Sequence, residues 1–175
     1  RLVGMTFQRG GLFDFLNAYD NLDFPLREVT SSSAKDRALM IREAFSDVGL
    51  SGQEGLFPHE MSGGMQKRLS LARAMVLLPS VMLYDDPTAG LDPVTSRSIV
   101  DLIVRMKNKY KMTVMIATSE LNIARRCSDR VVFLHRGEIR QIGTCDEIWH
   151  AMDPVIRQFV TGSTDGPLTD EEVCL

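Results

Sequence analysis

The chain has 175 residues, enough for one domain with a sizeable core, and 44% hydrophobic and 25% charged residues are ordinary globular values. Its formal net charge of −3 excludes a broad basic surface, so nucleic acid is not an expected partner. The three cysteines are far apart, without metal-binding spacing, and are expected to be free thiols. No apolar run approaches the ~20 residues that a membrane-spanning helix needs.

The predicted elements alternate between strands and helices. Unbroken apolar runs predict buried strands, and apolar residues on one face predict helices. In chain order we expect strand 2–7, helix 34–48, helix 63–77, strand 81–84, helix 93–108, strand 113–117, helix 121–127, a hairpin at 130–142 and two closing helices. This order predicts an α/β fold with a parallel sheet flanked by helices. Residues 161–175, acidic and poor in large apolar side chains, are expected to form a surface tail.

Two acidic residues, Asp85 and Asp86, follow the apolar run "VMLY". In α/β sheets ligands bind at the carboxyl ends of the strands. One carboxylate there can hold Mg²⁺ through water, and a second can orient or deprotonate a water. Strand ends also carry Asp simply as a turn or helix cap, so the pair alone leaves both interpretations open.

The stretch "MSGGMQKRLSLARA" places two glycines in front of a helix. Ser62 offers a hydroxyl donor, and Gly63 and Gly64 let the backbone come close to an anion. The amino end of the helix adds free N–H groups and the positive end of its dipole. The alternative is a plain N-cap before a flexible Gly-Gly pair.

The helix that follows is expected to bury one stripe and to expose its basic residues. The expected buried residues are Met65, Leu69, Ala72 and Val76. The residues expected on solvated faces, without a catalytic role, are Lys67, Arg68 and Arg73.

Taken together, these segments resemble the ATPase subunits of ATP-binding-cassette (ABC) transporters over essentially the whole chain. Ser62–Gly64 resembles the signature motif, with Met65 at its variable end, and Val81–Asp85 resembles the Walker B strand. Ala89–Asp92 resembles the D-loop, and Gln8 the Q-loop glutamine. The resemblance implies the P-loop NTPase fold of an ABC-type nucleotide-binding domain with a helical subdomain, and ATP and Mg²⁺ as cofactors.

The resemblance also assigns roles to residues and ranges. It implies Asp85 and Gln8 as metal-binding residues, Asp86, Gln8 and Ser119 as catalytic residues, and Ser62, Gly63, Gly64, Met65 and Asp92 as nucleotide-binding residues. The predicted ranges are 1–8 for the end of a core strand and the Q-loop, 9–61 for the helical subdomain, 62–143 for the ATPase core, and 144–175 for the C-terminal helices and tail.

No G-x-x-x-x-G-K-[ST] motif occurs in the sequence. In the resembled family this phosphate-binding motif precedes the Q-loop glutamine, so we expect a fold that is incomplete at the N-terminus and a chain that does not bind ATP tightly by itself. Two subunits of that family pack head to tail, and the signature of one contacts the γ-phosphate held by the other. The resemblance therefore implies a second ATPase subunit, with a homodimer expected.

Two positions depart from the family's pattern. Asp86 stands where the family usually has glutamate, and a side chain one methylene shorter can cost about 10²-fold in rate. Ser119 stands at the position of the family's switch histidine, by alignment on Asp129. Besides an active ATPase, the sequence thus leaves open a degenerate nucleotide-binding subunit with little hydrolysis of its own. A cassette ATPase acting on DNA or ribosomes would need a coiled coil or a basic surface, and the sequence has neither.

Residues 11–28 and the ending "VIRQFVTGSTDGPL" resemble the ATPases of Mla/Mce-type lipid transporters. That resemblance implies transmembrane permease subunits, an Mce-type lipid-binding protein, and a peripheral location on the cytoplasmic face of the inner (plasma) membrane. The aromatic residues Phe13, Phe15 and Phe24 are expected either to dock a partner's helix or to form a small core of their own.

Overall fold

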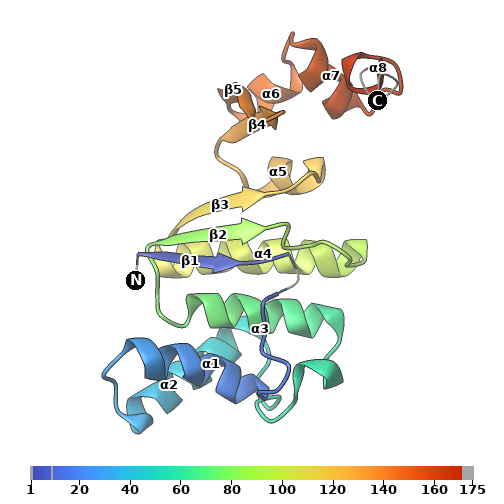
Figure 1. Ribbon diagram of the computed structural model, residues 1–175. Helices are drawn as coiled ribbons and strands as arrows, with labels where there is room; N and C mark the ends of the chain where they lie inside the picture. Colours follow the sequence, from blue (N-terminus) through green and yellow to red (C-terminus); the bar gives the residue numbers. More distant parts are fainter. Residues whose placement is uncertain (1, 9, 171–175) are drawn as a thin grey trace. The chain divides into compact units, whose positions relative to one another are not determined.

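The computed structural model describes residues 2–8 and 10–170, and the chain divides into two compact units, Arg1–Ser119 and Glu120–Leu175 (Figure 1). The boundary between the units falls inside the predicted range 62–143. The four ranges named above describe functional parts and stay a prediction.

The first unit is built on a three-stranded sheet in the order β1-β2-β3. The strands are β1 (Val3–Thr6), β2 (Val81–Asp85) and β3 (Thr113–Ala117). Both pairings are parallel, and the register places Tyr84 opposite Thr6 on one side and Ile116 on the other. The prediction of an α/β fold with a parallel sheet is confirmed.

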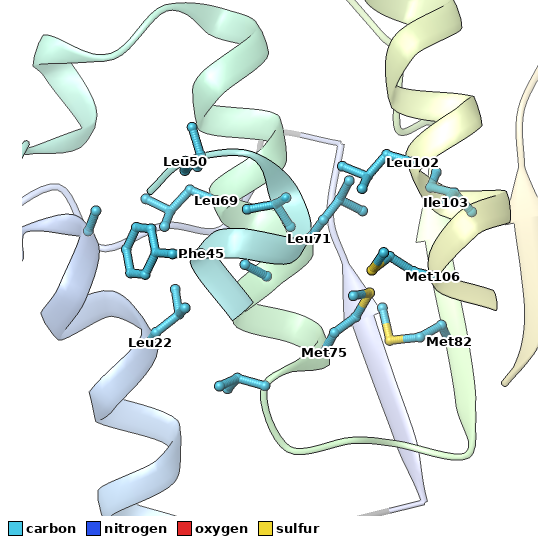
Figure 2. Packing of buried hydrophobic residues seen from close by; sticks show 14 of the residues in the cluster. Leu22, Phe45, Leu50, Leu69, Leu71, Met75, Met82, Leu102, Ile103 and Met106 are labelled. Carbon is cyan, nitrogen blue, oxygen red and sulfur yellow. The ribbon is translucent and has the colours of Figure 1, made fainter. Parts of the chain in front are cut away.

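One face of this sheet packs against helices α3 (Gly63–Met75) and α4 (Pro93–Tyr110). Figure 2 shows the close packing of Leu71 and Met75 of α3, Leu102, Ile103 and Met106 of α4, and Met82 of β2. Met82 and Tyr84 are buried on this face, whereas Met115 on the other face of the sheet is 62% exposed. The described core of the unit therefore lies on one side of the sheet.

Helices α1 (Ala18–Val29) and α2 (Ala34–Val48) and the 3₁₀ turn η1 (Pro58–Glu60) precede α3. The range of α2 is as predicted, because Ser33 caps its amino end and Gly49, at φ 68°, ends it. Helix α1 was not predicted as a separate helix, since Pro25 lies inside it and proline disfavours helix interiors. The burial of Ala18, Leu22 and Leu26 on one face offsets that cost.

The buried side chain of Asn21 fixes the segment that leads into α1. Its amide nitrogen donates to the carbonyls of Phe13, Leu16 and Asn17 at 3.0–3.1 Å, and its oxygen accepts from the N–H of Phe13 at 2.9 Å. One side chain thus makes four hydrogen bonds to the backbone of residues 13–17, which hold this segment against the start of α1.

The carboxyl end of α2 is tied to α4 by charged groups. Lys109 Nζ lies 2.7 Å from a carboxylate oxygen of Asp47 and 3.0 Å from one of Glu43. The hydroxyl of Tyr110 also donates to Asp47, and Arg105 donates to the carbonyl of Asp47 at 3.1 Å. These contacts join the helical part of the unit to the helix that supports the sheet.

The second unit contains α5 (Leu121–Cys127), the antiparallel hairpin β4 (Val131–His135) and β5 (Glu138–Gly143), α6 (Cys145–Trp149), α7 (Pro154–Thr161) and α8 (Pro167–Asp170). The predicted hairpin and closing helices are confirmed, and Ile148, Ala151 and Ile156 form their small core.

Residues 161–165 are exposed, as expected of a surface segment, but residues 166–169 are half-buried and pack against α7. The buried side chain of Gln158 accepts from the N–H of Leu168 at 2.7 Å and donates to Thr169 Oγ1 at 3.1 Å, which folds this segment onto α7. Residues 171–175 of the expected tail lie outside the described residues. None of the helices within residues 2–8 and 10–170 is long and apolar enough to cross a membrane.

Replacing Phe45 by alanine should lower the free energy of unfolding by about 3–5 kcal/mol, because the ring is fully buried and its removal leaves a cavity. Leu39 lies on the same helix, is 54% exposed and serves as the matched control. Leu39→Ala should cost no more than about 0.5 kcal/mol. Urea unfolding measures both changes, and equal losses would contradict this assignment of the core.

Tyr110 should make the stability of the first unit depend on alkaline pH. Burial raises the pKa of its phenol to about 12, its hydrogen bond with Asp47 adds to the rise, and Lys109 opposes it. Since the folded-state pKa lies above the ordinary value of 10.0, the stabilisation is complete below pH 10 and is lost as the pH rises toward 12.

Thermal unfolding across this pH range, on the wild type and Tyr110→Phe, tests the effect. The wild type should be the more stable protein at pH 9, and its advantage should shrink toward pH 12 as the phenol ionises. An advantage that stays constant with pH would show that this phenol does not titrate in the way described.

Candidate functional site

The carboxyl ends of the three parallel strands meet at one edge of the sheet. Asp85 is the last residue of β2 and is exposed, and it pairs with Ala117 at the end of β3. Gln8 follows β1 by two residues and Ser119 follows β3 by two, and both are exposed. The structure therefore places Gln8, Asp85 and Ser119 at the same edge, while the roles assigned to them stay predictions.

Asp86, the residue that follows β2 at this edge, has an unusual backbone conformation. Its N–H donates to the carbonyl of Ala117 at 2.9 Å, and its φ is +40°. Aspartate occupies the left-handed region more readily than residues with longer side chains. The local backbone thus gives a physical reason for a short acidic side chain at this position.

The carboxylate of Asp86 also has an unsatisfied oxygen. Its Oδ1 is buried and has no hydrogen-bond partner. A buried acceptor without a donor is costly, and such a group in a native protein often indicates that a ligand or water supplies the donor. The orphaned oxygen fits the predicted role of Asp86 as the group that binds the attacking water.

The residues at the edge also fit Mg²⁺ together with a nucleotide. Within the part of the chain that the structure describes, no three His, Cys, Asp or Glu side chains gather into a metal site. Magnesium bound with a nucleotide commonly uses only one or two carboxylates and completes its shell with phosphates and water. The exposed carboxylate of Asp85 and the amide oxygen of Gln8 could supply the protein ligands.

Helix α3 opens at Ser62, whose Oγ accepts from the N–H of Met65 at 3.3 Å. Ser62 is therefore an N-cap, as the plain interpretation of this motif requires. An accepting hydroxyl keeps its own hydrogen for a second partner. Ser62 and Gly63 are both exposed, so capping does not exclude contact with an anion.

The two glycines of the motif differ in their surroundings. A Cβ on Gly64 would lie 2.9 Å from Thr95 Cγ2, so Gly64 permits the close packing of α3 on α4. A Cβ on Gly63 would lie 3.7 Å from Leu91 Cδ2, which is an ordinary contact. The fold thus requires glycine at 64 and leaves position 63 open.

Met65 and Asp92 both make contacts that stabilise the fold. The half-buried side chain of Met65 packs against the core. Asp92 caps α4, and its Oδ1 accepts from the N–H of Val94 at 2.9 Å and of Thr95 at 3.0 Å. Hydrogen bonds from the side chain and backbone of Thr95 lower the pKa of Asp92. Any contact of these two residues with nucleotide stays a prediction.

The expectation that the basic residues of α3 lie on solvated faces is wrong. All three are half-buried, because the segment after β1 and the end of α2 cover these sides of the helix. Lys67 donates to the carbonyl of Gln8, and Arg73 to that of Gly11. Arg68 donates to the carbonyl of Val48 at 2.9 Å.

Lys67 also lies near the acidic pair. Burial lowers the pKa of its ammonium group, and the charges of Asp86 and Asp85 oppose this fall. Sequence reasoning missed Lys67 as a site residue, although its place three residues after Gly64 offered a weak signal. A lysine at the strand edge brings positive charge to the position where phosphates are predicted to bind.

Comparisons with known proteins agree with this geometry. A family model described as "ABC transporter" matches residues 1–89. The "Probable ribonucleotide transport ATP-binding protein mkl" of Mycobacterium tuberculosis is 41% identical over 167 residues, which cover 95% of this chain and 46% of that protein. The "Protein TRIGALACTOSYLDIACYLGLYCEROL 3, chloroplastic" of Arabidopsis thaliana is 36% identical over 182 residues, which cover 95% of this chain and 53% of that protein.

Among solved structures, the dimeric post-hydrolysis state of the ATP-binding cassette MJ0796 bound to ADP and Pi matches with a TM-score of 0.72 and 29% identity. The match covers 82% of this chain and 62% of that chain. The chain therefore belongs to the ABC transporter family, and its fold is that of the family's ATP-binding domain. It spans about half the length of the relatives that it matches.

Alanine should affect the two glycines of the signature differently. Gly64→Ala should lower the free energy of unfolding by about 1–3 kcal/mol, because the new methyl group meets Thr95. Gly63→Ala should stay within about 0.5 kcal/mol of the wild type. Chemical denaturation of the two variants measures the difference, and a larger loss for Gly63→Ala would contradict this packing.

Proposed function

We propose that this chain is the ATP-binding part of an ABC transporter subunit that couples ATP binding and hydrolysis to the transport of a lipid. The observation that carries the proposal is the sheet edge, where Asp85 and Asp86 with its unpaired buried oxygen lie beside Gln8. The exposed amino end of α3 supplies a second phosphate-binding surface.

On this proposal the residues at the sheet edge have different roles in ATP hydrolysis. Asp85 and Gln8 would hold Mg²⁺, which when bound neutralises negative charge on the phosphates. Asp86 accepts a hydrogen bond from the attacking water through its unpaired oxygen and can take its proton. Ser119 donates one hydrogen bond but carries no charge at neutral pH.

The amino end of α3 serves a second subunit. Ser62 donates its free hydroxyl hydrogen, and the backbone at Gly63 comes close to a phosphate without steric hindrance. The dimer of MJ0796 with ADP and Pi supports a dimeric arrangement for this protein as well. On this proposal the active form is a homodimer in which each signature completes the partner's site.

A lipid substrate is supported by the likeness of 11–28 and of the chain's ending to Mla/Mce-type ATPases. One relative is named for trigalactosyldiacylglycerol, a glycolipid, whereas another is named for ribonucleotide transport. We propose transmembrane permease subunits and an Mce-type lipid-binding protein as partners, at the cytoplasmic face of the inner membrane.

The three aromatic residues after the Q-loop form one small cluster and differ in exposure. Phe13 and Phe24 are half-buried and pack edge to face with ring centroids 5.1 Å apart, and the ring of Phe15 lies 5.5 Å from that of Phe13. Phe15 is 76% exposed. We propose that Phe15 contacts the permease, since an exposed aromatic side chain beside a small apolar cluster is a common anchor at interfaces.

The second candidate function is a regulatory cassette that binds nucleotide and hydrolyses it slowly. The observations that favour it are Ser119, which cannot carry charge at neutral pH, and the short side chain of Asp86 on a strained backbone. Such a subunit would still complete the site of its partner through Ser62.

Turnover of ATP by the full-length protein separates these two functions. Asp86→Asn should lower kcat by about 10²-fold or more, because the amide keeps the shape and loses the proton acceptor. Asp146→Asn, an exposed change in α6, is the matched control and should leave turnover unchanged.

Ser119→His should raise turnover if the site is degenerate. Wild-type turnover equal to that of ordinary family members would rule out the regulatory candidate. Undetectable turnover in the wild type and in Ser119→His would instead rule out the enzyme.

Transport itself is tested on the protein reconstituted with its permease subunits in phospholipid vesicles. Labelled phospholipid should move between the protein-containing vesicles and an acceptor in an ATP-dependent manner, and ribonucleotides other than the ATP supplied should not stimulate turnover. Stimulation by a ribonucleotide without lipid movement would contradict the lipid substrate while leaving the ATPase intact.

A further inference from the structure

Two cysteines of the second unit lie together at the carboxyl end of α5. Cys127 is the last residue of this helix, and its thiol donates to the carbonyl of Ile123 at 3.0 Å. Cys145 is the first residue of α6, and its sulfur lies 3.5 Å from the carbonyl oxygen of Ala124 and 3.9 Å from that of Ser128. Because Ile123 and Ala124 are consecutive residues of α5, the two sulfur atoms lie at neighbouring carbonyls of one helical turn.

The hairpin between the two cysteines is what brings them together. Strands β4 and β5 pair so that Val131 lies opposite Gly143 at the open end of the hairpin. Continued outward by two residues, this antiparallel register places Asp129 opposite Cys145. Cys127 precedes Asp129 by two residues. The fold therefore places both cysteines beside the open end of one hairpin, although they are far apart in the sequence.

A bond between the two sulfur atoms needs the movement of one side chain. In a helix a short polar side chain can reach the carbonyl three or four residues before it. Cys127 contacts the carbonyl four residues back, that of Ile123. Rotation about its Cα–Cβ bond takes its sulfur to the carbonyl three residues back, that of Ala124, where the sulfur of Cys145 already lies. Formation of a disulfide therefore requires a change of rotamer and no change of fold.

The exposure of the two thiols suits a reaction with a small oxidant. Both cysteines are half-buried thiols in the structure. When peroxide oxidises a thiol to a sulfenic acid, a second thiol close by converts that acid into a disulfide before irreversible oxidation follows. The alternative role of the two thiols is only to satisfy carbonyls at the end of α5, which have no partner within the helix. In that role the two cysteines would react independently of each other.

We propose that Cys127 and Cys145 form a peroxide-sensitive dithiol, which oxidation converts into a disulfide that fastens the end of α5 to the open end of the hairpin. Hydrogen peroxide first oxidises one thiol to a sulfenic acid, and one water leaves. The second thiol then attacks the oxidised sulfur, the S–S bond forms, and the oxygen leaves as a second water. The pair gives up two electrons and two protons, which the two oxygens of the peroxide take up.

The reverse reaction needs a thiol reductant such as glutathione or dithiothreitol. One thiol of the reductant attacks the disulfide, a second thiol resolves the mixed disulfide, and both cysteines return to the reduced form. The reaction requires neither ATP nor a transport partner, so it is independent of the proposed function.

The bond itself is tested on the full-length protein, first reduced with dithiothreitol and then treated with hydrogen peroxide. Mass spectrometry of unreduced peptides should find Cys127 linked to Cys145, and dithiothreitol should remove the link. Cys174→Ser removes the third cysteine, which lies outside the described residues, and should leave the link unchanged. Irreversible oxidation of either cysteine without the link, or a link to Cys174 in its place, would overturn the proposal.

The variants Cys127→Ser and Cys145→Ser distinguish a cooperating pair from two independent thiols. Serine keeps a donor for the carbonyls of α5, so both variants should fold, and their thermal unfolding in the reduced state should match that of the wild type. Under peroxide the remaining cysteine of each variant should reach the sulfinic acid about 10-fold faster than in the wild type, because no second thiol traps the sulfenic acid. Equal rates in the wild type and both variants would overturn the proposal.

Amide hydrogen exchange tests whether the bond fastens the second unit. In the oxidised wild type the amides of the hairpin, residues 131–143, should exchange about 10-fold more slowly than in the reduced protein, because the disulfide restricts opening of this segment. Cys127→Ser is the matched control, and peroxide should leave its exchange unchanged. Equal exchange in the oxidised and reduced wild type, or the same slowing in Cys127→Ser, would overturn the proposal.

Discussion

The site depends on the parallel pairing of β1, β2 and β3 in a common register. Because all three strands run the same way, the residues that follow them leave the sheet together at one edge. The pairing is held from one side by side chains of β2, where Met82 and Tyr84 are buried against α3 and α4. A one-residue slip of β2 would turn these side chains outward and move Asp85 off the edge.

Helix α3 connects the remaining features of the first unit to this sheet. Its buried face packs on the core, its amino end at Ser62 and Gly63 is exposed, and Ser70 on its polar side donates to the carbonyl of Gly10. A Cβ on Gly64 would lie 2.9 Å from Thr95 Cγ2, so glycine at this position allows α3 to lie close to α4. Core packing and the hydrogen bond of Lys67 to the carbonyl of Gln8 therefore use different faces of one helix.

The sequence predicts the strands and most helices because local signals mark them. The apolar run Thr113–Ala117 and the capping of α2 by Ser33 and Gly49 are visible in a few neighbouring residues. Helix α1 could not be predicted from the sequence, because Pro25 is unfavourable inside a helix. Only the burial of Ala18, Leu22 and Leu26 makes this helix stable.

The motif residues proposed for the site can be recognised in the sequence, and their roles stay predictions, whereas their environments could not be predicted. Lys67 donates to the carbonyl of Gln8, which is far from it in the chain. The partner of a basic side chain cannot be predicted from the sequence around it. The positive φ of Asp86 arises directly after the last residue of β2, so it too depends on tertiary structure.

The face of the sheet that points away from α3 and α4 is apolar, and its residues Val3 and Met115 are more than half exposed. This exposure affects the solubility of the chain. Within the described residues β1 is the end strand of this sheet, and an apolar sheet face beside an end strand favours contact between molecules, so the protein is expected to self-associate as its concentration rises.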